Sequence, residues 1–123
     1  MRITTKLIDP NNTKYQYANG VLENAINNFM EREYKFVSNK VGSTELNYVI
    51  GQVENIEKKD SGEIFADIEL LDTFEGRIYK ELIKQGNNIN FGISGRGNIN
   101  DDGVIENFNI KDISVISWNR NQE

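Results

Sequence analysis

The chain has 123 residues, of which 37% are hydrophobic and 10% aromatic, enough to fill the core of a single domain spanning residues 1–123. Its 14 Lys and Arg against 19 Asp and Glu give a net charge of −5, which argues against a general nucleic-acid-binding protein. It contains no cysteine and no histidine, so disulfides, thiolate catalysis and the usual zinc, haem and iron–sulfur ligand sets are excluded. We expect no cofactor and no metal. Because it shows no signal-peptide pattern and no apolar run of about 18 residues, we also expect no membrane contact.

The first half of the chain is predicted to combine short strands with one helix. Residues 3–8 are expected to form a strand, which Asp9-Pro10 ends. Between residues 21 and 32, apolar side chains recur at the i, i+1, i+4 and i+5 spacing of an amphipathic helix. Residues 34–37 suggest a second strand, and residues 46–51 show the alternation of a third.

The second half is predicted to hold a hairpin, a helix and a closing pair of strands. Residues 64–71 give the cleanest two-residue alternation in the chain, after a turn at KKDSG. Residues 89–94 are expected to form a strand that ends within GISGRG, and residues 104–118 to supply one long or two short strands.

A second helix is expected between residues 72 and 86. Asp72 is the predicted N-cap, with Glu75 placed as its capping-box partner, and Gly86 is placed to end the helix. The predicted buried stripe consists of Phe74, Ile78, Leu82 and Ile83. Together these elements predict an α+β fold with two helices and a mainly antiparallel sheet or small β-barrel.

The segment GISGRG, residues 92–97, is the main candidate site. Ser94 lies between glycines, so it could be a nucleophile with main-chain N–H groups beside it and Arg96 adding positive charge. The alternative, favoured from this segment alone, is that Gly92, Gly95 and Gly97 serve a bulge at the end of a strand. An α/β-hydrolase elbow is excluded, because it requires a following helix and a downstream histidine.

A serine nucleophile needs a base, and the sequence offers few. Among the lysines, Lys40 is the one arguable candidate, since it lies near apolar Val37 and Val41 and a lysine base must be desolvated. Asp67 and Glu69 share one face of a predicted strand, but we interpret them as a solvated face rather than an acid–base or metal pair.

Four segments, taken in order, resemble the prohead (head-maturation) serine proteases of tailed phages, in their T4-like branch. They are residues 18–29 (ANGVLENAINNF), 68–86 (IELLDTFEGRIYKELIKQG), 92–97 (GISGRG) and 104–117 (VIENFNIKDISVIS). The resemblance implies a herpesvirus-protease-like (assemblin-like) fold. It also implies that Ser94 or Gly95 occupies the position of the nucleophile, with Gly95 and Arg96 as remnants of the oxyanion side.

The chain departs from that family at both catalytic histidines. One histidine segment corresponds to residues 36–44, which contain Lys40, and the other falls near Tyr48. The resemblance therefore implies a non-catalytic virion protein, either an auxiliary (decoration) or a minor capsid protein. Its expected partners are the major capsid protein, other head proteins or further copies of itself, with no nucleic acid. Two alternatives stay open: an active maturation protease that pairs Ser94 with Lys40 or Tyr48 and cleaves capsid or scaffold proteins, and a small binding module unrelated to capsids.

Overall fold

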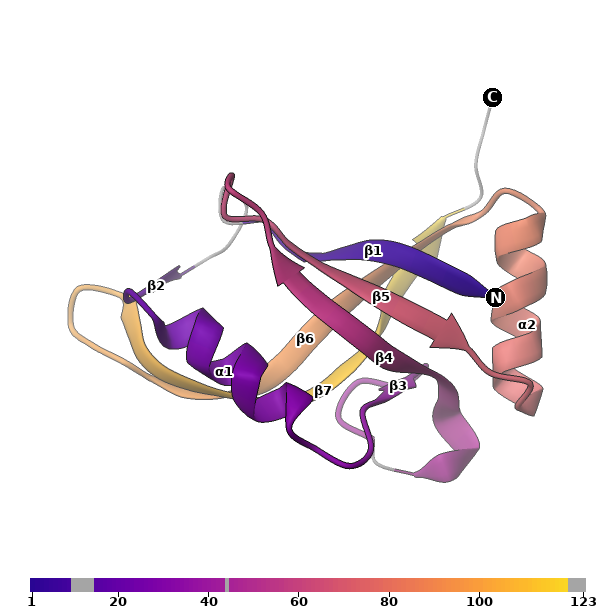
Figure 1. Ribbon diagram of the computed structural model, residues 1–123, viewed down its shortest axis with the longest axis horizontal. Helices are drawn as coiled ribbons and strands as arrows, with labels where there is room; N and C mark the ends of the chain where they lie inside the picture. The colour runs from indigo at the N-terminus through magenta and orange to yellow at the C-terminus, as the bar shows by residue number, and fades with distance from the viewer. Residues whose placement is uncertain (10–14, 44, 120–123) are drawn as a thin grey trace.

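The computed structural model describes residues 1–9, 15–43 and 45–119, and these residues form two α-helices and seven strands (Figure 1). The α+β class predicted from the sequence is confirmed. In chain order the elements are β1 (Arg2–Ile8), β2 (Gln16–Tyr17), α1 (Val21–Met30), β3 (Phe36–Ser38), the 3-10 helix η1 (Leu46–Tyr48), β4 (Val49–Lys58), β5 (Ile64–Leu70), α2 (Phe74–Lys84), β6 (Asn88–Ile99) and β7 (Val104–Asn119). None of the helices in the described segments has the length and apolar character needed to cross a membrane.

The seven strands form one curled, mixed sheet in the order β1-β5-β4-β3-β7-β2, with β6 paired along the other edge of β7. The β1–β5, β5–β4, β4–β3 and β6–β7 pairs are antiparallel, whereas β3 and β2 each run parallel to β7. β1 and β6 come close together, but no ladder of hydrogen bonds joins them in the described chain. The sheet is therefore a half-barrel, and the closed small barrel offered as an alternative is not formed.

β7 owes its curvature to a repeated irregularity. The 15 residues from Ile105 to Asn119 lie opposite only 12 residues of β6, and the register skips three β7 residues, Glu106, Lys111 and Ile116. Each skipped residue is a β-bulge, which bends the strand and increases its twist. Because the bulges recur every five residues, β7 bends along its whole length and can pair with β2 near its start and β3 near its middle.

The core lies on the concave side of the sheet, under α1. α1 buries the apolar face predicted from its spacing, and β5 alternates buried and half-buried residues along its length as expected. The core side chains of α1 are Val21, Leu22, Ala25, Ile26 and Phe29.

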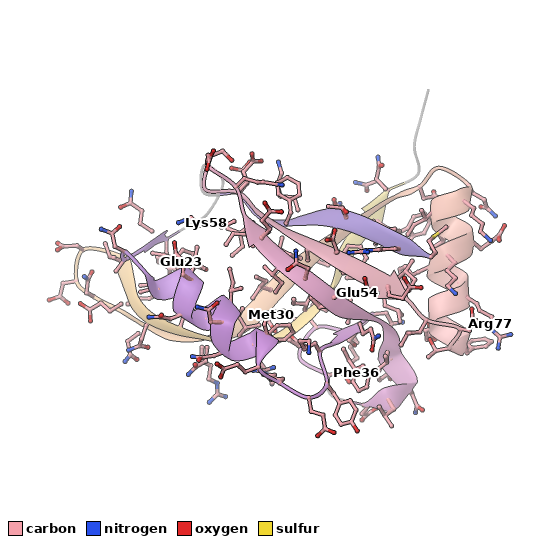
Figure 2. The ribbon with its side chains drawn as sticks, viewed as in Figure 1. Glu23, Met30, Phe36, Glu54, Lys58 and Arg77 are labelled. Carbon is pink, nitrogen blue, oxygen red and sulfur yellow. The ribbon has the colours of Figure 1, made fainter. Side chains whose placement is uncertain are left out.

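At the surface, an ion pair joins α1 to β4: Lys58 Nζ of β4 lies 2.5 Å from Glu23 Oε1 of α1 (Figure 2). Both side chains are exposed, so this ion pair contributes at most about 1 kcal/mol to stability.

α2 confirms the predicted helix, but only part of the predicted stripe is buried. Phe74 is 78% exposed and Ile78 43% exposed, whereas Ile83 packs against the core as predicted, together with Tyr79, which was not predicted. Gly76 explains the difference: a Cβ there would overlap the main-chain oxygen of Leu71 and come within 2.9 Å of that of Ile50. The helix turns Gly76, and not Phe74, toward the sheet because only glycine permits this close approach.

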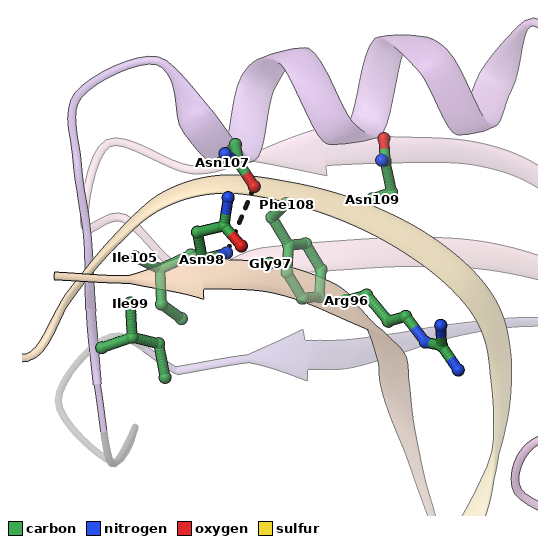
Figure 3. Close-up of a pocket in the computed structure, with 9 residues that line it drawn as sticks. Arg96, Gly97, Asn98, Ile99, Ile105, Asn107, Phe108 and Asn109 are labelled. Atoms are coloured by element: carbon green, nitrogen blue, oxygen red, sulfur yellow. Dashed lines mark hydrogen bonds between the residues drawn. The ribbon is translucent and has the colours of Figure 1, made fainter.

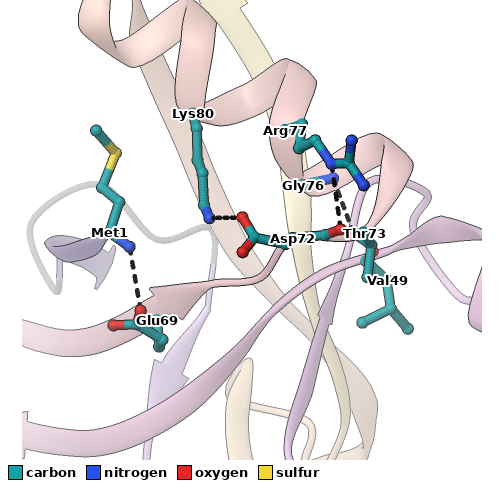
Figure 4. Close-up of polar contacts among 8 residues, drawn as sticks. All are labelled: Met1, Val49, Glu69, Asp72, Thr73, Gly76, Arg77 and Lys80. Atoms are coloured by element: carbon teal, nitrogen blue, oxygen red, sulfur yellow. Dashed lines mark hydrogen bonds and ion pairs between the residues drawn. The ribbon is translucent and has the colours of Figure 1, made fainter.

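The N-cap of α2 is Thr73, so the prediction of Asp72 was wrong. Thr73 Oγ1 accepts a hydrogen bond from Gly76 N at 2.9 Å and donates one to Val49 O at 2.7 Å (Figure 4). Asp72 lies outside the helix and pairs with Lys80 Nζ at 2.5 Å. Thr73 is favoured as the N-cap because its hydroxyl accepts the bond from the helix and donates one to β4 at the same time.

Two strand predictions also need correction. Leu46 and Tyr48 belong to the 3-10 helix η1, and the strand begins at Val49 and continues to Lys58. The segment GISGRG lies inside β6 and not at a strand end, because pairing with β7 continues to Ile99. The glycines do accompany a bulge, since the register shifts between Ser94 and Gly95.

Candidate functional site

Ser94 is held against a buried carboxylate. The β6–β7 register places Ser94 directly opposite Asp112, and Ser94 Oγ donates a hydrogen bond to Asp112 Oδ1. Asp112 is only 7% exposed, and its second oxygen, Oδ2, accepts a hydrogen bond from Gly42 N at 2.8 Å. The carboxylate thus joins β6, β7 and the loop that follows β3.

Two further serines lie on the same face of the sheet. Ser114 follows Asp112 by two residues on β7, so both side chains point away from the core, and Ser38 of β3 pairs with Ser114 in parallel register. Ser38 and Ser114 are both buried. Ser38 Oγ accepts from Lys40 N and donates to Lys40 O, each at 3.1 Å, whereas Ser114 Oγ has no partner in the described residues. A layer of buried hydroxyls therefore underlies the loop.

Arg32, two residues after the end of α1, stabilises the bulge at Lys111. Arg32 donates to the main-chain oxygens of Ile110 and of Lys111, the latter at 3.0 Å, and its guanidinium lies 4.9 Å from the centre of the Phe29 ring. Beside it is a cavity of about 140 Å³ whose wall includes Asp112. This volume is smaller than the roughly 300–1,000 Å³ of typical ligand pockets.

Lys40 and Tyr48 meet one another and not Ser94. Lys40 Nζ lies 5.0 Å from the centre of the Tyr48 ring, a cation–π contact at the surface. In the described part of the chain, no hydrogen bond joins either side chain to Ser94. The two residues considered as alternative bases are therefore brought together, but neither is placed to take the serine's proton.

Gly95 and Arg96 lie along a groove of about 590 Å³ on the β6–β7 ribbon (Figure 3). A Cβ at Gly95 would overlap the main-chain oxygen of Asn109 and approach Phe108 Cζ to 2.7 Å. Glycine is therefore required for strand packing, as the bulge interpretation predicts. The Arg96 side chain points away from the Phe108 ring in Figure 3 and is exposed.

No model of a protein family, no curated protein and no solved structure matches this chain.

The carboxylates considered from the sequence are separated from this site. Asp67 accepts from Thr4 Oγ1 at 2.6 Å and pairs with Arg2, and the hydrogen bond from Thr4 lowers the pKa of Asp67. Glu69 binds the N-terminal amine of Met1 at 3.1 Å. The two residues occupy a polar strand face with separate partners, as expected, and do not form an acid–base pair.

Asp112 is the residue that sequence reasoning missed. It sits in IKDISVIS, where it is the one acidic residue in a segment made mainly of isoleucine, valine and serine, and this was the available signal. Its position opposite Ser94 depends on the bulge at Lys111, because a regular ladder would shift the pairing by one residue.

In this arrangement the Ser94 hydroxyl keeps its proton and donates a hydrogen bond to Asp112. A nucleophilic serine needs a base that accepts its proton during attack, usually a histidine. Here the hydroxyl donates to a carboxylate, a weak base, whose other oxygen is already engaged by Gly42 N. The hydrogen bonds of Ser94 and Asp112 thus connect β6, β7 and the loop that follows β3.

Proposed function

We propose that this chain is a non-catalytic structural protein of a phage head, either an auxiliary (decoration) or a minor capsid protein, on a degenerate prohead-protease-like scaffold. One observation carries the non-catalytic part: the hydroxyl of Ser94 is bound by Asp112, and neither Lys40 nor Tyr48 reaches it. The phage-head part rests on the four sequence segments that resemble the prohead proteases, with both family histidines replaced.

The proposed partners are the major capsid protein or other head proteins, and the proposed location is the virion. The net charge of −5 supports contact with a basic patch on a shell protein. Head assembly would use the surface of this chain, and the cavity beside Asp112 is smaller than a typical ligand pocket.

Two measurements test the proposal. Purified protein is treated with a fluorophosphonate probe, with an active serine hydrolase as positive control, and we expect no labelling. Mature particles are then analysed by quantitative mass spectrometry, and we expect a fixed ratio of this chain to the major capsid protein. Its absence from mature particles would refute the capsid role.

The protease alternative predicts the opposite results. Co-expression with the phage's own capsid and scaffold proteins would then yield cleavage products that disappear in Ser94→Ala. Such cleavage would replace the present proposal with an active maturation protease. A chain that neither labels, nor cleaves, nor enters particles would be a binding module unrelated to the capsid.

A further inference from the structure

A pocket where three segments of the chain meet is lined by positively charged side chains. It has a volume of about 300 Å³, and its wall consists of Arg32, Arg96, Asn109, Ile110 and Lys111. Arg32 follows α1, Arg96 lies on β6, and the other three residues lie on β7 around one of its bulges. This basic pocket thus brings together two arginines and a lysine that are far apart in the sequence, in a chain whose net charge is −5.

No carboxylate lines the basic pocket. Its three cations form no ion pair within the described residues. Ser94 and Asp112 lie outside its wall, and the oxygens of Asp112 accept hydrogen bonds from Ser94 Oγ and Gly42 N. Because like charges held at one pocket repel one another, an anion bound among the three cations would remove an unfavourable interaction.

Arg32 is already held in a fixed position at this pocket. Its guanidinium donates one hydrogen bond to the main-chain oxygen of Ile110 and one to that of Lys111. A guanidinium has five N–H groups, so three remain available for a ligand. Glu31 and Glu33, its acidic neighbours in the sequence, do not line the pocket and form no ion pair with it in the described part of the chain. The ordering cost of this side chain has therefore been met before a ligand arrives.

We propose that the basic pocket binds a phosphate monoester of a small organic molecule, with its phosphate group among Arg32, Arg96 and Lys111. A phosphate monoester carries close to two negative charges at neutral pH, which suits three cations better than a single carboxylate does. The planar fork of arginine also binds phosphate oxygens in pairs. The pocket volume lies at the lower end of the roughly 300–1,000 Å³ of small-molecule sites, which leaves room for an organic group. Asn109 adds an amide that can form hydrogen bonds with this group. The inference goes beyond the proposed function, since neither serine labelling nor particle content tests it.

Calorimetric titration of the full chain with glycerol phosphate tests the pocket. The ionic strength is kept constant, so that general screening is equal in all samples. We expect a dissociation constant at or below about 1 mM, and binding at least about tenfold weaker in Arg96→Gln and in Lys111→Gln, because each removes one charge-assisted contact. Arg77→Gln and Lys84→Gln remove the same charge from exposed positions on α2, so these matched controls should bind like the unmodified chain. Arg32 is left unchanged because its bonds to β7 also support the fold.

Two further ligands distinguish the sources of the phosphate group. Inorganic phosphate should bind more weakly than glycerol phosphate, and equal affinity would overturn the monoester in favour of the free ion. A short single-stranded oligonucleotide that binds at least about tenfold more tightly than the monoester would overturn it in favour of a nucleic-acid surface. Circular dichroism checks that all variants fold. Absence of binding at about 10 mM glycerol phosphate, or an equal loss of affinity in the pocket variants and the α2 controls, refutes the proposal.

Discussion

The Ser94–Asp112 contact makes a quantitative prediction about stability. Asp112 is buried and accepts two hydrogen bonds, one from the Ser94 hydroxyl and one from Gly42 N. A hydrogen bond to a charged group contributes about 1.5–3 kcal/mol, and a buried acceptor that loses its donor keeps its desolvation penalty. Ser94→Ala should therefore lower the free energy of unfolding by about 1.5–3 kcal/mol. For a chain of this size, about 4 °C of melting temperature corresponds to each kcal/mol.

Asp112→Ala should lower the free energy of unfolding further than Ser94→Ala does, because it leaves both donors without their acceptor. We expect a loss of about 2–4 kcal/mol, since water can reach the exposed Gly42 amide but not the buried strand face. The double variant should cost less than the sum of the single ones, with a coupling energy of about 1–2 kcal/mol for the shared hydrogen bond. Urea denaturation followed by circular dichroism and by the fluorescence of Trp118 measures all four free energies.

Ser117→Ala is the matched control, because Ser117 lies in the same β6–β7 pair as Ser94 and its side chain accepts one exposed hydrogen bond within the described residues, from Asn90 Nδ2. It should change the free energy of unfolding by less than about 0.5 kcal/mol. A Ser94→Ala variant as stable as this control, or more stable than the unmodified chain, would refute the reasoning. The second result is the behaviour of a strained catalytic residue, which costs stability for activity.

Three further predictions concern other parts of the fold. Thr73→Ala should destabilise the chain by about 1–2 kcal/mol in urea denaturation, because both hydrogen bonds of the α2 cap are lost, whereas Thr73→Ser should retain most of the stability. Gly95→Ala should lower the free energy of unfolding by about 3 kcal/mol, since the added Cβ overlaps a main-chain oxygen of β7. Gly92→Ala should lower it less, because the added Cβ meets only the movable side chain of Ile116. The melting temperatures of the two variants check this order. The pKa of Asp67 is lowered in the folded chain by the Thr4 hydroxyl, so its contribution is present above the ordinary pKa near 4 and lost as the pH falls through that region. Melting temperatures between pH 2 and 6 should accordingly drop on the acid side, and less steeply in Thr4→Val than in the unmodified chain.

The parts of the fold that the sequence predicted well are those whose pattern is local. α1 and β5 each bury one face against a single neighbouring layer, so their apolar spacing is sufficient to identify both the element and its buried side.

The parts that failed depend on contacts between distant residues. The spacing of α2 fits two faces, and the choice between them is made by Gly76 against the carbonyl of Ile50, which no local pattern reveals. The candidate site was incomplete for a related reason. Ser94 was found because glycines surround it, but its partner Asp112 is 18 residues away, and their pairing depends on a bulge at Lys111.

The half-barrel is open between β1 and β6 in the described chain. This open seam divides the strands into two groups whose main-chain amides differ in access to solvent. β5 has a neighbour on both edges along its whole length, so nearly every main-chain amide in it is bound within the sheet, whereas β4 has a second neighbour only where it pairs with β3, at Val49–Gln52. β1 and β6 have a hydrogen-bonded neighbour on one edge only in the described chain, so every second amide along them points toward the seam. In deuterium exchange these strands should therefore show an alternating pattern, with one fast amide after each slow one, although the sheet as a whole stays folded. The same two rows of free amides and carbonyls are where a neighbouring chain could extend the sheet, and Arg2 and Lys6 on β1 place charges beside one of them.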